Sequence, residues 1–366
     1  MPTALHDDGT IVGFTNACGS LNYRAFRRLP TGELQILPLP PGAFGGTAND
    51  IAPDGTIVGS VDVPIPNDST YLIAVWSSAG VVMASMPNPT DFASGNGAGN
   101  GGLAVGDCGN GWTGPLPCAW QNGKYVPVPR ALAALHGRFN DVNRFGVVVG
   151  SVYATTGFID GKIALWFGDG SVTLLEPPRG YPGCEAVDVN ASCSVAGMGR
   201  TSPAAVDGHG FLWRDGEAID LGLLPNYTMT DVRGMNDLDQ VVGMAWNSPS
   251  SLKPFLWRDG QMYDLTQLAP PPVNAYYDVA QAINNTGQIA ILGGRPPNKH
   301  RIFLLTPLSV AAADVTVDCA VDVRDLNVVL ACWGPRSTSP VERADIDGDG
   351  TIGPRDLAEV LAGWTP

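Results

Sequence analysis

The sequence predicts an all-β fold, a seven-bladed β-propeller of four-stranded repeats, with a small α-helical calcium-loop domain at the C-terminus. Three observations predict it. A short phrase recurs seven times within residues 1–307 at intervals of about 46 residues, and an aromatic phrase follows nearly every copy at a fixed place. From residue 314 onward a different repeat of 31 residues begins. We therefore expect a propeller over 1–307, a linker over 308–313 and a tandem calcium-loop domain over 314–366.

The composition supports a repetitive β protein. The 46 glycines and 31 prolines make up about a fifth of the 366 residues, which long helices do not tolerate. Apolar residues at 44% and charged residues at 15% argue against disorder. The net charge of −14 disfavours a nucleic-acid partner. We find no apolar run of the roughly 18 residues that a membrane helix needs, and the first ten residues lack the apolar stretch of a signal peptide.

The recurring phrase has the form N-x-x-G-x-[VI]-V-G. Its copies are HDDGTIVG from His6, APDGTIVG from Ala52, GNGGLAVG from Gly99, NRFGVVVG from Asn143, NASCSVAG from Asn190, NDLDQVVG from Asn236 and NNTGQIAI from Asn284. One short apolar stretch precedes each phrase and two follow it, separated by Asp-Gly and Asn-Gly turns. Such alternation is typical of antiparallel hairpins. Four strands in about 46 residues match one propeller blade.

A large aromatic residue stands at the same place in most units. The tryptophans at this place are Trp76, Trp120, Trp166, Trp213 and Trp257. We interpret them as core residues that fill the wedge between neighbouring sheets, rather than as platforms for carbohydrate. Units one, three and seven depart most from the pattern, with Arg27 or Arg28 in unit one and Leu305 in unit seven at the tryptophan position.

Closure of the ring needs an outer strand for the last blade, and the first unit has barely six residues before its turn. We expect that the natural start lies upstream of Met1, with a signal peptide and one further strand. Blade seven would close either with residues 305–311 or with that upstream segment.

The turn phrase, its VVG strand, the following A-F-L-W and the D-L-G resemble the bacterial extracellular HAF repeat, best over residues 227–265. The resemblance covers about 300 residues and recurs in register. It implies a secreted, propeller-like domain and assigns no catalytic residues.

Three aspartates are the candidates for catalysis in the ring. The segments ANDIA, FNDVN and AVDVN place Asp50, Asp141 and Asp188 at equivalent positions of the strand that faces the channel. Glycosidases use two carboxylates about 5 to 10 Å apart, so these residues are weak candidates for acid–base chemistry. Recurrence in several units instead favours a structural role, in which each side chain bonds to the backbone. We therefore expect that the chain is not an enzyme.

Other residues give no catalytic constellation. The polar residues that break the repeat pattern are Arg233, His6, His136, His209 and His300. They form no recognisable set of acid, base and nucleophile. The sequence has no G-x-S-x-G and no phosphate-binding G-x-x-x-x-G-K, and the glycine-rich stretch 94–102 falls on a repeat turn.

The seven cysteines are mostly near neighbours in the sequence. The possible short-range pairs are Cys108 with Cys118, Cys184 with Cys193 and Cys319 with Cys332, which leaves Cys18 over. We expect at least two such disulfides and hence an oxidising compartment, although free thiols in turns give the same spacing.

The end of the chain contains two aligned copies of a calcium-loop motif. In the second copy, oxygen ligands stand at loop positions 1, 3, 5, 7 and 12 and Gly350 stands at the sharp turn of position 6; these ligands are Asp345, Asp347, Asp349, Thr351 and Asp356. Calcium needs six to eight oxygen ligands, and this spacing brings them around one point. The first copy keeps Asp314, Thr316, Asp318, Ala320, Asp322 and Asp325, with Cys319 in place of the turn glycine. We expect two calcium ions, with the alternative that the acids of the first copy form a solvated surface.

A short helix is expected after each loop. Leu326, Leu330 and Trp333 fall on one helical face, and Leu357, Leu361 and Trp364 repeat them in the second copy. The sequence predicts that the two helices pack together through these residues. Four carboxylates in one loop repel one another, so the domain should fold only weakly without metal.

Aspartate at position 12 and a lone helix after each loop resemble type I dockerins, and the W-G-P ending with its cysteine pair resembles GC-type dockerins more narrowly. This resemblance covers residues 314–366. It implies calcium binding and docking onto a cohesin or another surface module. Positions 10 and 11, often Ser-Thr in dockerins, are Val323-Arg324 and Pro354-Arg355 here, which puts a standard cellulosomal partner in doubt.

These features predict a secreted, monomeric, non-catalytic binding or display propeller. Its tail would anchor it in a calcium-dependent way to a cohesin-like or cell-surface partner. A propeller face would bind a glycan or protein ligand. The alternative is a glycoside hydrolase, or another polysaccharide-active propeller enzyme, carried by a dockerin.

Overall fold

A computed structural model describes most of the chain. The described residues are 1–16, 22–66, 68–84, 91–109, 114–154, 160–200, 208–248, 251–295, 300–307, 315, 321, 323–335, 344–347 and 349–362. They fall into two compact units, Met1–Leu305 and Thr306–Pro366. The predicted linker lies outside the described residues. No helix of the described part is both long and apolar enough to cross a membrane.

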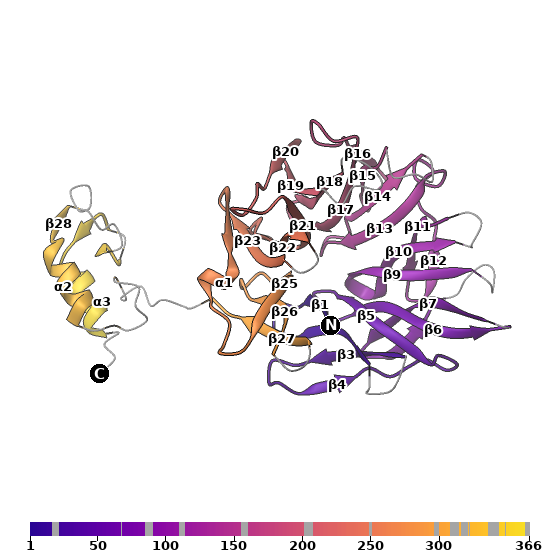
Figure 1. The fold of residues 1–366 in the computed structure, drawn as a ribbon, viewed down its shortest axis with the longest axis horizontal. Coiled ribbons are helices and arrows are strands. Elements are labelled where there is room, and N and C mark those ends of the chain that lie inside the picture. The colour runs from indigo at the N-terminus through magenta and orange to yellow at the C-terminus, as the bar shows by residue number, and fades with distance from the viewer. Residues whose placement is uncertain are drawn as a thin grey trace. The chain divides into compact units, whose positions relative to one another are not determined.

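The first unit is the predicted seven-bladed propeller, a ring of antiparallel sheets (Figure 1). The first three blades consist of β1 Pro2–Leu5, β2 Ile11–Asn16, β3 Tyr23–Arg28 and β4 Leu34–Ile36; β5 Gly45–Ile51, β6 Ile57–Ile65, β7 Asp68–Ser77 and β8 Gly80–Met83; and β9 Phe92–Gly99, β10 Leu103–Gly109, β11 Leu116–Gln121 and β12 Lys124–Val126, with a 3-10 turn at Asn100–Gly102.

The remaining four blades follow in the same order along the chain. They consist of β13 His136–Val142, β14 Val148–Tyr153, β15 Lys162–Trp166 and β16 Val172–Leu175; β17 Gly183–Val189, β18 Val195–Arg200, β19 Gly208–Arg214 and β20 Glu217–Asp220; β21 Met229–Met235, β22 Val241–Ser248, β23 Ser251–Arg258 and β24 Gln261–Asp264, followed by helix α1 Leu265–Leu268; and β25 Tyr276–Ile283, β26 Ile289–Gly294 and β27 His300–Leu305.

The strand order gives the ring two different faces. In every blade the first strand lines the central channel and the next strands follow outward in chain order. The recurring N-x-x-G phrase connects the first strand to the second, so all seven copies lie at one end of the ring, which we call the turn face. The loops between second and third strands and the connections between blades lie at the opposite end, which we call the loop face.

A β-bulge in each inner strand explains the last glycine of the repeat phrase. In β5 the pairing with β6 skips Asn49 between Ala48 and Asp50, and similar shifts occur in the other six blades. The bulge brings a carbonyl of the inner strand onto the second strand. A Cβ at Gly59 would collide with the carbonyl oxygen of Thr47. At Gly59 only glycine fits without moving the backbone; five other units also have glycine at this place, and unit seven has Ile291 there.

The blades pack through the repeated aromatic residues. Trp76, Trp120, Trp213 and Trp257 are at most 5% exposed. Each of these joins a cluster that spans two blades: Trp120 of blade three, for example, packs with Val58, Ile73 and Val75 of blade two. The sheet-to-sheet contact is therefore continuous around the ring, as a wedge-shaped arrangement requires.

In the part of the chain that the structure describes, the first and last blades share no strand. Among the described residues blade seven has three strands, β25 to β27, while blade one has all four from its own sequence. Leu5, Ile11 and Phe26 of blade one form a cluster with Ala282 and Ala290 of blade seven. Side-chain packing and the hydrogen bonds described below therefore hold this joint.

The second unit contains two helices and a short two-stranded sheet. The elements are α2 Val323–Ala331, α3 Pro354–Ala362, β28 Gly334–Pro335 and β29 Thr351–Ile352. Val329 and Val360 are fully buried between the helices, with Leu326 and Leu357 partly buried beside them.

The predicted packing face of these helices was wrong by about one position. Leu330, Leu361 and Trp333 are 50%, 55% and 49% exposed. The valine one residue before each leucine takes the interior, together with the aspartates Asp325 and Asp356. Trp364 lies outside the described residues.

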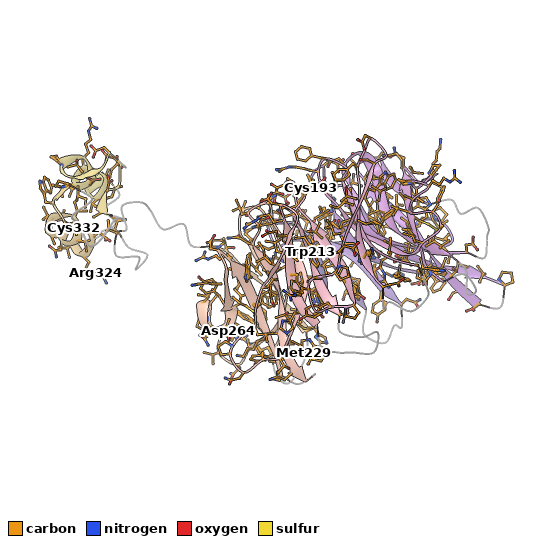
Figure 2. The ribbon with its side chains drawn as sticks, turned by 90° about the horizontal axis from the view of Figure 1, so that it is seen from above. Cys193, Trp213, Met229, Asp264, Arg324 and Cys332 are labelled. Atoms are coloured by element: carbon orange, nitrogen blue, oxygen red, sulfur yellow. A yellow bond between two sulfur atoms is a disulfide. The ribbon has the colours of Figure 1, made fainter. Side chains whose placement is uncertain are left out.

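One predicted disulfide is confirmed and the other two are wrong. Cys108 of β10 is bonded to Cys118 of β11. Cys184 and Cys193 are free because they lie at opposite ends of the β17–β18 hairpin. Cys184 pairs with Gly199, whereas Cys193, which Figure 2 labels, stands in the turn. Cys193 has a φ of 62° and takes the position that glycine holds in other units. Cys332 is also free, so its predicted bond to Cys319 is wrong as well; Cys319 itself and Cys18 lie outside the described residues.

Candidate functional site

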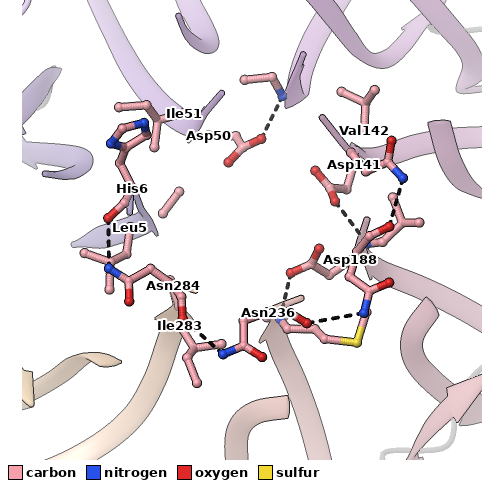
Figure 3. A pocket seen from close by; sticks show the side chains of 18 of the residues that line it. Leu5, His6, Asp50, Ile51, Asp141, Val142, Asp188, Asn236, Ile283 and Asn284 are labelled. Atoms are coloured by element: carbon pink, nitrogen blue, oxygen red, sulfur yellow. Dashed lines mark hydrogen bonds between the residues drawn. The ribbon is translucent and has the colours of Figure 1, made fainter. Parts of the chain in front are cut away.

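The central channel encloses a pocket of about 300 Å³ (Figure 3). All seven inner strands contribute to its wall, which carries Asp50, Asp141 and Asp188 together with several asparagines. The structure thus brings the three candidate aspartates into one cavity, near the middle of the ring.

Each of these aspartates accepts a hydrogen bond from the backbone of the next blade. Asp50 accepts from the amide of Ala98 at 2.7 Å, and Asp141 from that of Val189 at 3.0 Å. Asp188 accepts from the amide of Met235 at 2.7 Å. The bulge turns each side chain sideways along the ring, so that the carboxylate joins two neighbouring sheets.

The same carboxyl groups resist ionisation. Burial raises the pKa of Asp50 to about 7, and the nearby charge of Asp141 adds to the effect. Burial also raises the pKa of Asp141 well above its usual value and that of Asp188 to a smaller degree. The neighbouring carboxyl group of Asp188 adds to the rise in the pKa of Asp141.

The other polar residues singled out by the sequence are scattered. Arg233 occupies the bulge of β21 and donates to Asp231 at 2.8 Å. His6 lies at the turn face and hydrogen-bonds to the carbonyl of Pro53 at 3.1 Å. His136, His209 and His300 each lie in a strand segment next to the loop face, in three different blades.

A ring of asparagine side chains went unrecognised in the sequence. At the turn face, Asn143 accepts from the amides of Phe145 and Val147, and its amide group donates to the carbonyl of Asn190 in the next blade at 2.8 Å. Similar bonds join each blade to the next around the ring. Side-chain amide groups donate to a backbone carbonyl of the next blade in the pairs Asn190 to Asn236, Asn236 to Asn284, Asn284 to His6 and Asn100 to Arg144. The ring of His6 bonds to the carbonyl of Pro53, and the backbone amide of Asp54 donates to the side chain of Asn100. The recurrence of asparagine at the head of the phrase was the available signal.

In the second unit the predicted calcium loop brings its acids together. Carboxylate oxygens of Asp345, Asp347 and Asp349 lie within 4.8 Å of one another, the one acidic group of this kind among the described residues. Gly350 makes the sharp turn with a φ of 87°. Asp356, almost fully buried, accepts from the amides of Ile346, Asp347 and Gly353, and so clamps the end of the loop to its start.

These donors suit a hard cation. Carboxylate oxygens, with the backbone carbonyl of Thr351, are the ligands that calcium prefers, and nitrogen or sulfur donors are missing from the described part of the loop. In the first loop Asp314, Thr316, Asp318, Ala320 and Asp322 lie outside the described residues. Asp325, its last ligand, is buried at the start of α2 as Asp356 is at the start of α3.

No family model and no curated protein matches the chain. Solved propeller structures do match. The β-propeller domain of the trilobed protease from Pyrococcus furiosus aligns with a TM-score of 0.52 at 12% identity, over 83% of this chain and 94% of that one. Acylaminoacyl peptidase from Pyrococcus horikoshii aligns with a TM-score of 0.51 at 14% identity, over 83% of this chain and 50% of that one.

A third match is a puromycin hydrolase S511A mutant, with a TM-score of 0.52, 12% identity and coverage of 83% of this chain and 52% of the hydrolase. The chain thus spans about half the length of the two hydrolytic enzymes. At these identities the likeness shows the propeller fold alone.

Proposed function

We propose that this chain is a secreted, non-catalytic binding or display propeller that its C-terminal unit anchors to a partner in a calcium-dependent way. The observation that carries the proposal is the use of the channel aspartates: each one bonds to the backbone of the next blade. A carboxylate committed to holding the ring together is a poor general acid or base.

The bonding of the acids also disfavours the alternative, a glycoside hydrolase. Hydrolysis of a glycosidic bond needs two carboxyl groups about 5 to 10 Å apart, with the sugar or a water molecule between them. In the channel, Asp50, Asp141 and Asp188 each already accept a backbone amide of the next blade, so part of their acceptor capacity is used within the ring.

The second unit supports the calcium part of the proposal. Asp345, Asp347, Asp349 and Asp356 would hold the ion through their carboxylates, and Thr351 through its carbonyl. A bound calcium ion neutralises the mutual repulsion of these acids and fixes the loop that precedes α3. Metal binding would thereby stabilise the small core around Val329 and Val360.

The exposed helix residues support docking. Leu330 and Leu361 stand at equivalent positions of the two copies and both are about half exposed, as is Trp333. A cluster of large exposed apolar residues marks an interaction surface, and these three residues are our candidates for one. We propose that they contact a cohesin-like or other cell-surface module. The disulfide Cys108–Cys118 supports an oxidising compartment outside the cytosol.

Limited proteolysis of the full chain tests the calcium dependence. We expect calcium to slow cleavage within residues 315–362 at least tenfold compared with EDTA, because the metal couples loop order to helix packing. The double variant Asp347→Asn/Asp349→Asn should lose this protection. Asp169→Asn, an aspartate in a propeller turn, is the matched control and should keep it. Equal cleavage rates with and without calcium would contradict the proposal.

Binding to immobilised cohesin modules tests the docking surface. We expect binding in calcium, none in EDTA, and at least a tenfold loss with Leu330→Asp/Leu361→Asp. Leu238→Asp, which alters a leucine that is 68% exposed on the propeller, should leave binding unchanged. If calcium stabilises the C-terminal unit but no cohesin binds, the cohesin-like partner is refuted. The calcium-dependent anchor would then have to bind another surface partner.

The catalytic alternative is tested by reducing-end release from a panel of plant and microbial polysaccharides. We expect no turnover by the wild-type chain. Turnover that Asp141→Asn or Asp188→Asn abolishes, in variants with unchanged unfolding curves, would establish the enzyme and refute the non-catalytic role.

A further inference from the structure

A second pocket opens at the loop face, where three blades meet. It measures about 380 Å³, within the roughly 300 to 1,000 Å³ of small-molecule sites. Its wall includes Tyr71 of β7, Phe92 and Asn96 of β9, Asp107 of β10 and Arg138 of β13. Asn96 also lines the central channel, so the two cavities meet at this side chain.

Arg138 differs from the other arginines near the channel. Arg200 is paired with Glu185 at 3.0 Å, and Arg233 with Asp231 at 2.8 Å. Arg138 is exposed and makes no ion pair or hydrogen bond within the part of the chain that the structure describes. Its guanidinium group therefore presents its donors to the pocket.

Asp107 is the complementary group. It is only 9% exposed, yet the described residues give it a single hydrogen bond, 3.3 Å long, from the amide group of Asn96. A carboxylate in so enclosed a place normally accepts several bonds. Burial raises the pKa of Asp107, and the nearby Arg138 opposes this rise. Most of the acceptor capacity of Asp107 thus remains for a ligand.

An aromatic pair completes the wall. Tyr71 is 42% exposed and lies against Phe92, with ring centroids 5.3 Å apart and planes inclined by 43°. The C–H groups on one face of a sugar ring are attracted to such an aromatic face. The disulfide Cys108–Cys118 ties together the two strands next to Asp107 and so fixes this part of the wall.

We propose that this pocket, which we call the loop-face pocket, binds one unit of a neutral glycan. Tyr71 stacks on the sugar ring, Asp107 accepts hydrogen bonds from hydroxyl groups, and Arg138 donates to hydroxyl oxygens. The inference deepens the proposed binding function by naming its site and ligand class, and it rests on that function.

The charges favour a neutral sugar over an anionic polymer. One carboxylate and one guanidinium make the pocket itself close to neutral. The whole chain carries a net charge of −14, which repels a polyanion. Two neighbouring hydroxyl groups of a sugar can donate to a carboxylate and accept from a guanidinium group at the same time. The pocket offers both groups, in Asp107 and Arg138.

Calorimetric titration of the full chain with cellohexaose, laminarihexaose, mannohexaose and xylohexaose tests the inference. We expect saturable binding of at least one of these glycans. Tyr71→Ala and Asp107→Asn should each weaken that binding at least tenfold, and Arg138→Gln at least threefold. Tyr125→Ala removes a tyrosine of blade three that has the same 42% exposure as Tyr71, and it should change affinity less than twofold.

Three outcomes would overturn the inference: no binding of any of the four glycans, tighter binding of oligogalacturonate or polyglutamate than of every neutral glycan, or equal losses from Tyr71→Ala and Tyr125→Ala. Chromatography of the sugar after each titration separates this site from the proposed function. Bound but cleaved glycan would refute the non-catalytic role and leave the site intact. Absence of glycan binding would refute the site and leave the calcium-dependent anchor intact.

Discussion

The two faces of the propeller use their polar side chains differently. At the turn face, Asn143, Asn190, Asn236 and Asn284 each satisfy a turn of their own blade and bond to the next blade as well. At the loop face, Arg138 makes no polar contact with the described residues, and Asp107 makes one.

This difference separates groups that build the ring from groups that remain available to a ligand. A buried asparagine with all its bonds made stabilises one arrangement of the blades. An enclosed carboxylate whose oxygens lack hydrogen-bond donors lowers the stability of the fold slightly. A ligand that donates hydrogen bonds to those oxygens regains this free energy when it binds. Polar residues that the fold leaves incompletely bonded are therefore the better functional candidates here, even though the turn-face residues are the more conspicuous in the repeat.

The largest expected effect is at the turn face. Asn236→Ala removes bonds to Leu238, Gln240 and Asn284 at a side chain that is 3% exposed. The variant loses four hydrogen bonds, and at about 1 kcal/mol for each we expect the free energy of unfolding to fall by about 3 to 4 kcal/mol. Guanidinium denaturation followed by tryptophan fluorescence measures it. A loss below about 1 kcal/mol would show that the asparagine circle contributes little.

At the loop face the main stabilising link is covalent. Cys108→Ser/Cys118→Ser opens a loop closed over a sequence separation of 10. We expect a loss of about 2 to 3 kcal/mol, because the unfolded chain regains entropy. The same denaturation experiment checks it, and adding reductant to the wild-type chain should give the same shift. Reductant should leave the double variant unchanged.

The channel between the faces should make stability depend on pH. The pKa of Asp50 is raised in the folded state, so its stabilising contribution is complete below the unfolded value near 4 and is lost as pH rises through about 7. Asp50→Asn keeps an acceptor for the amide of Ala98. Between pH 5 and pH 8, we expect the free energy of unfolding to fall by about 1 to 2 kcal/mol less in the variant than in the wild type. Parallel pH profiles for the two proteins would contradict this.

The smallest expected effect belongs to Arg138. Because its guanidinium contacts no described acceptor, Arg138→Ala should change the free energy of unfolding by less than about 0.5 kcal/mol. Arg200→Ala, which breaks an existing pair with Glu185, is the matched control and should cost more. Equal costs for the two variants would remove the distinction between paired and available arginines.

Much of the ring followed from periodicity. The phrase recurs in register, so strand number, turn positions and the places of Trp120 and Trp213 could be read from one unit and applied to the next. The sideways hydrogen bonds of Asn143 could not be read from a single unit, since the partner lies 47 residues away in the next blade. The recurrence itself would have suggested them.

The loop-face pocket left no sequence signal. Tyr71, Asp107 and Arg138 come from three blades and from different positions within the repeat, so only the fold brings them together. The Cys184–Cys193 prediction failed for the opposite reason. Residues nine apart are close in sequence, but a hairpin of this length places them at its two ends. In the C-terminal unit, a shift of one residue along each helix was enough to exchange Leu330 for Val329 in the core.

The central claim is that the channel aspartates join blades rather than act on a substrate. The most direct test compares the free energies of unfolding of Asp188→Ala and Asp188→Asn in the full chain at pH 8. Asparagine can still accept from the amide of Met235 and carries no charge, so we predict that this variant is at least as stable as the wild type. Alanine leaves that amide without its acceptor, and we predict a loss of about 1 to 3 kcal/mol. Equal stability of the alanine variant and the wild type would contradict the claim.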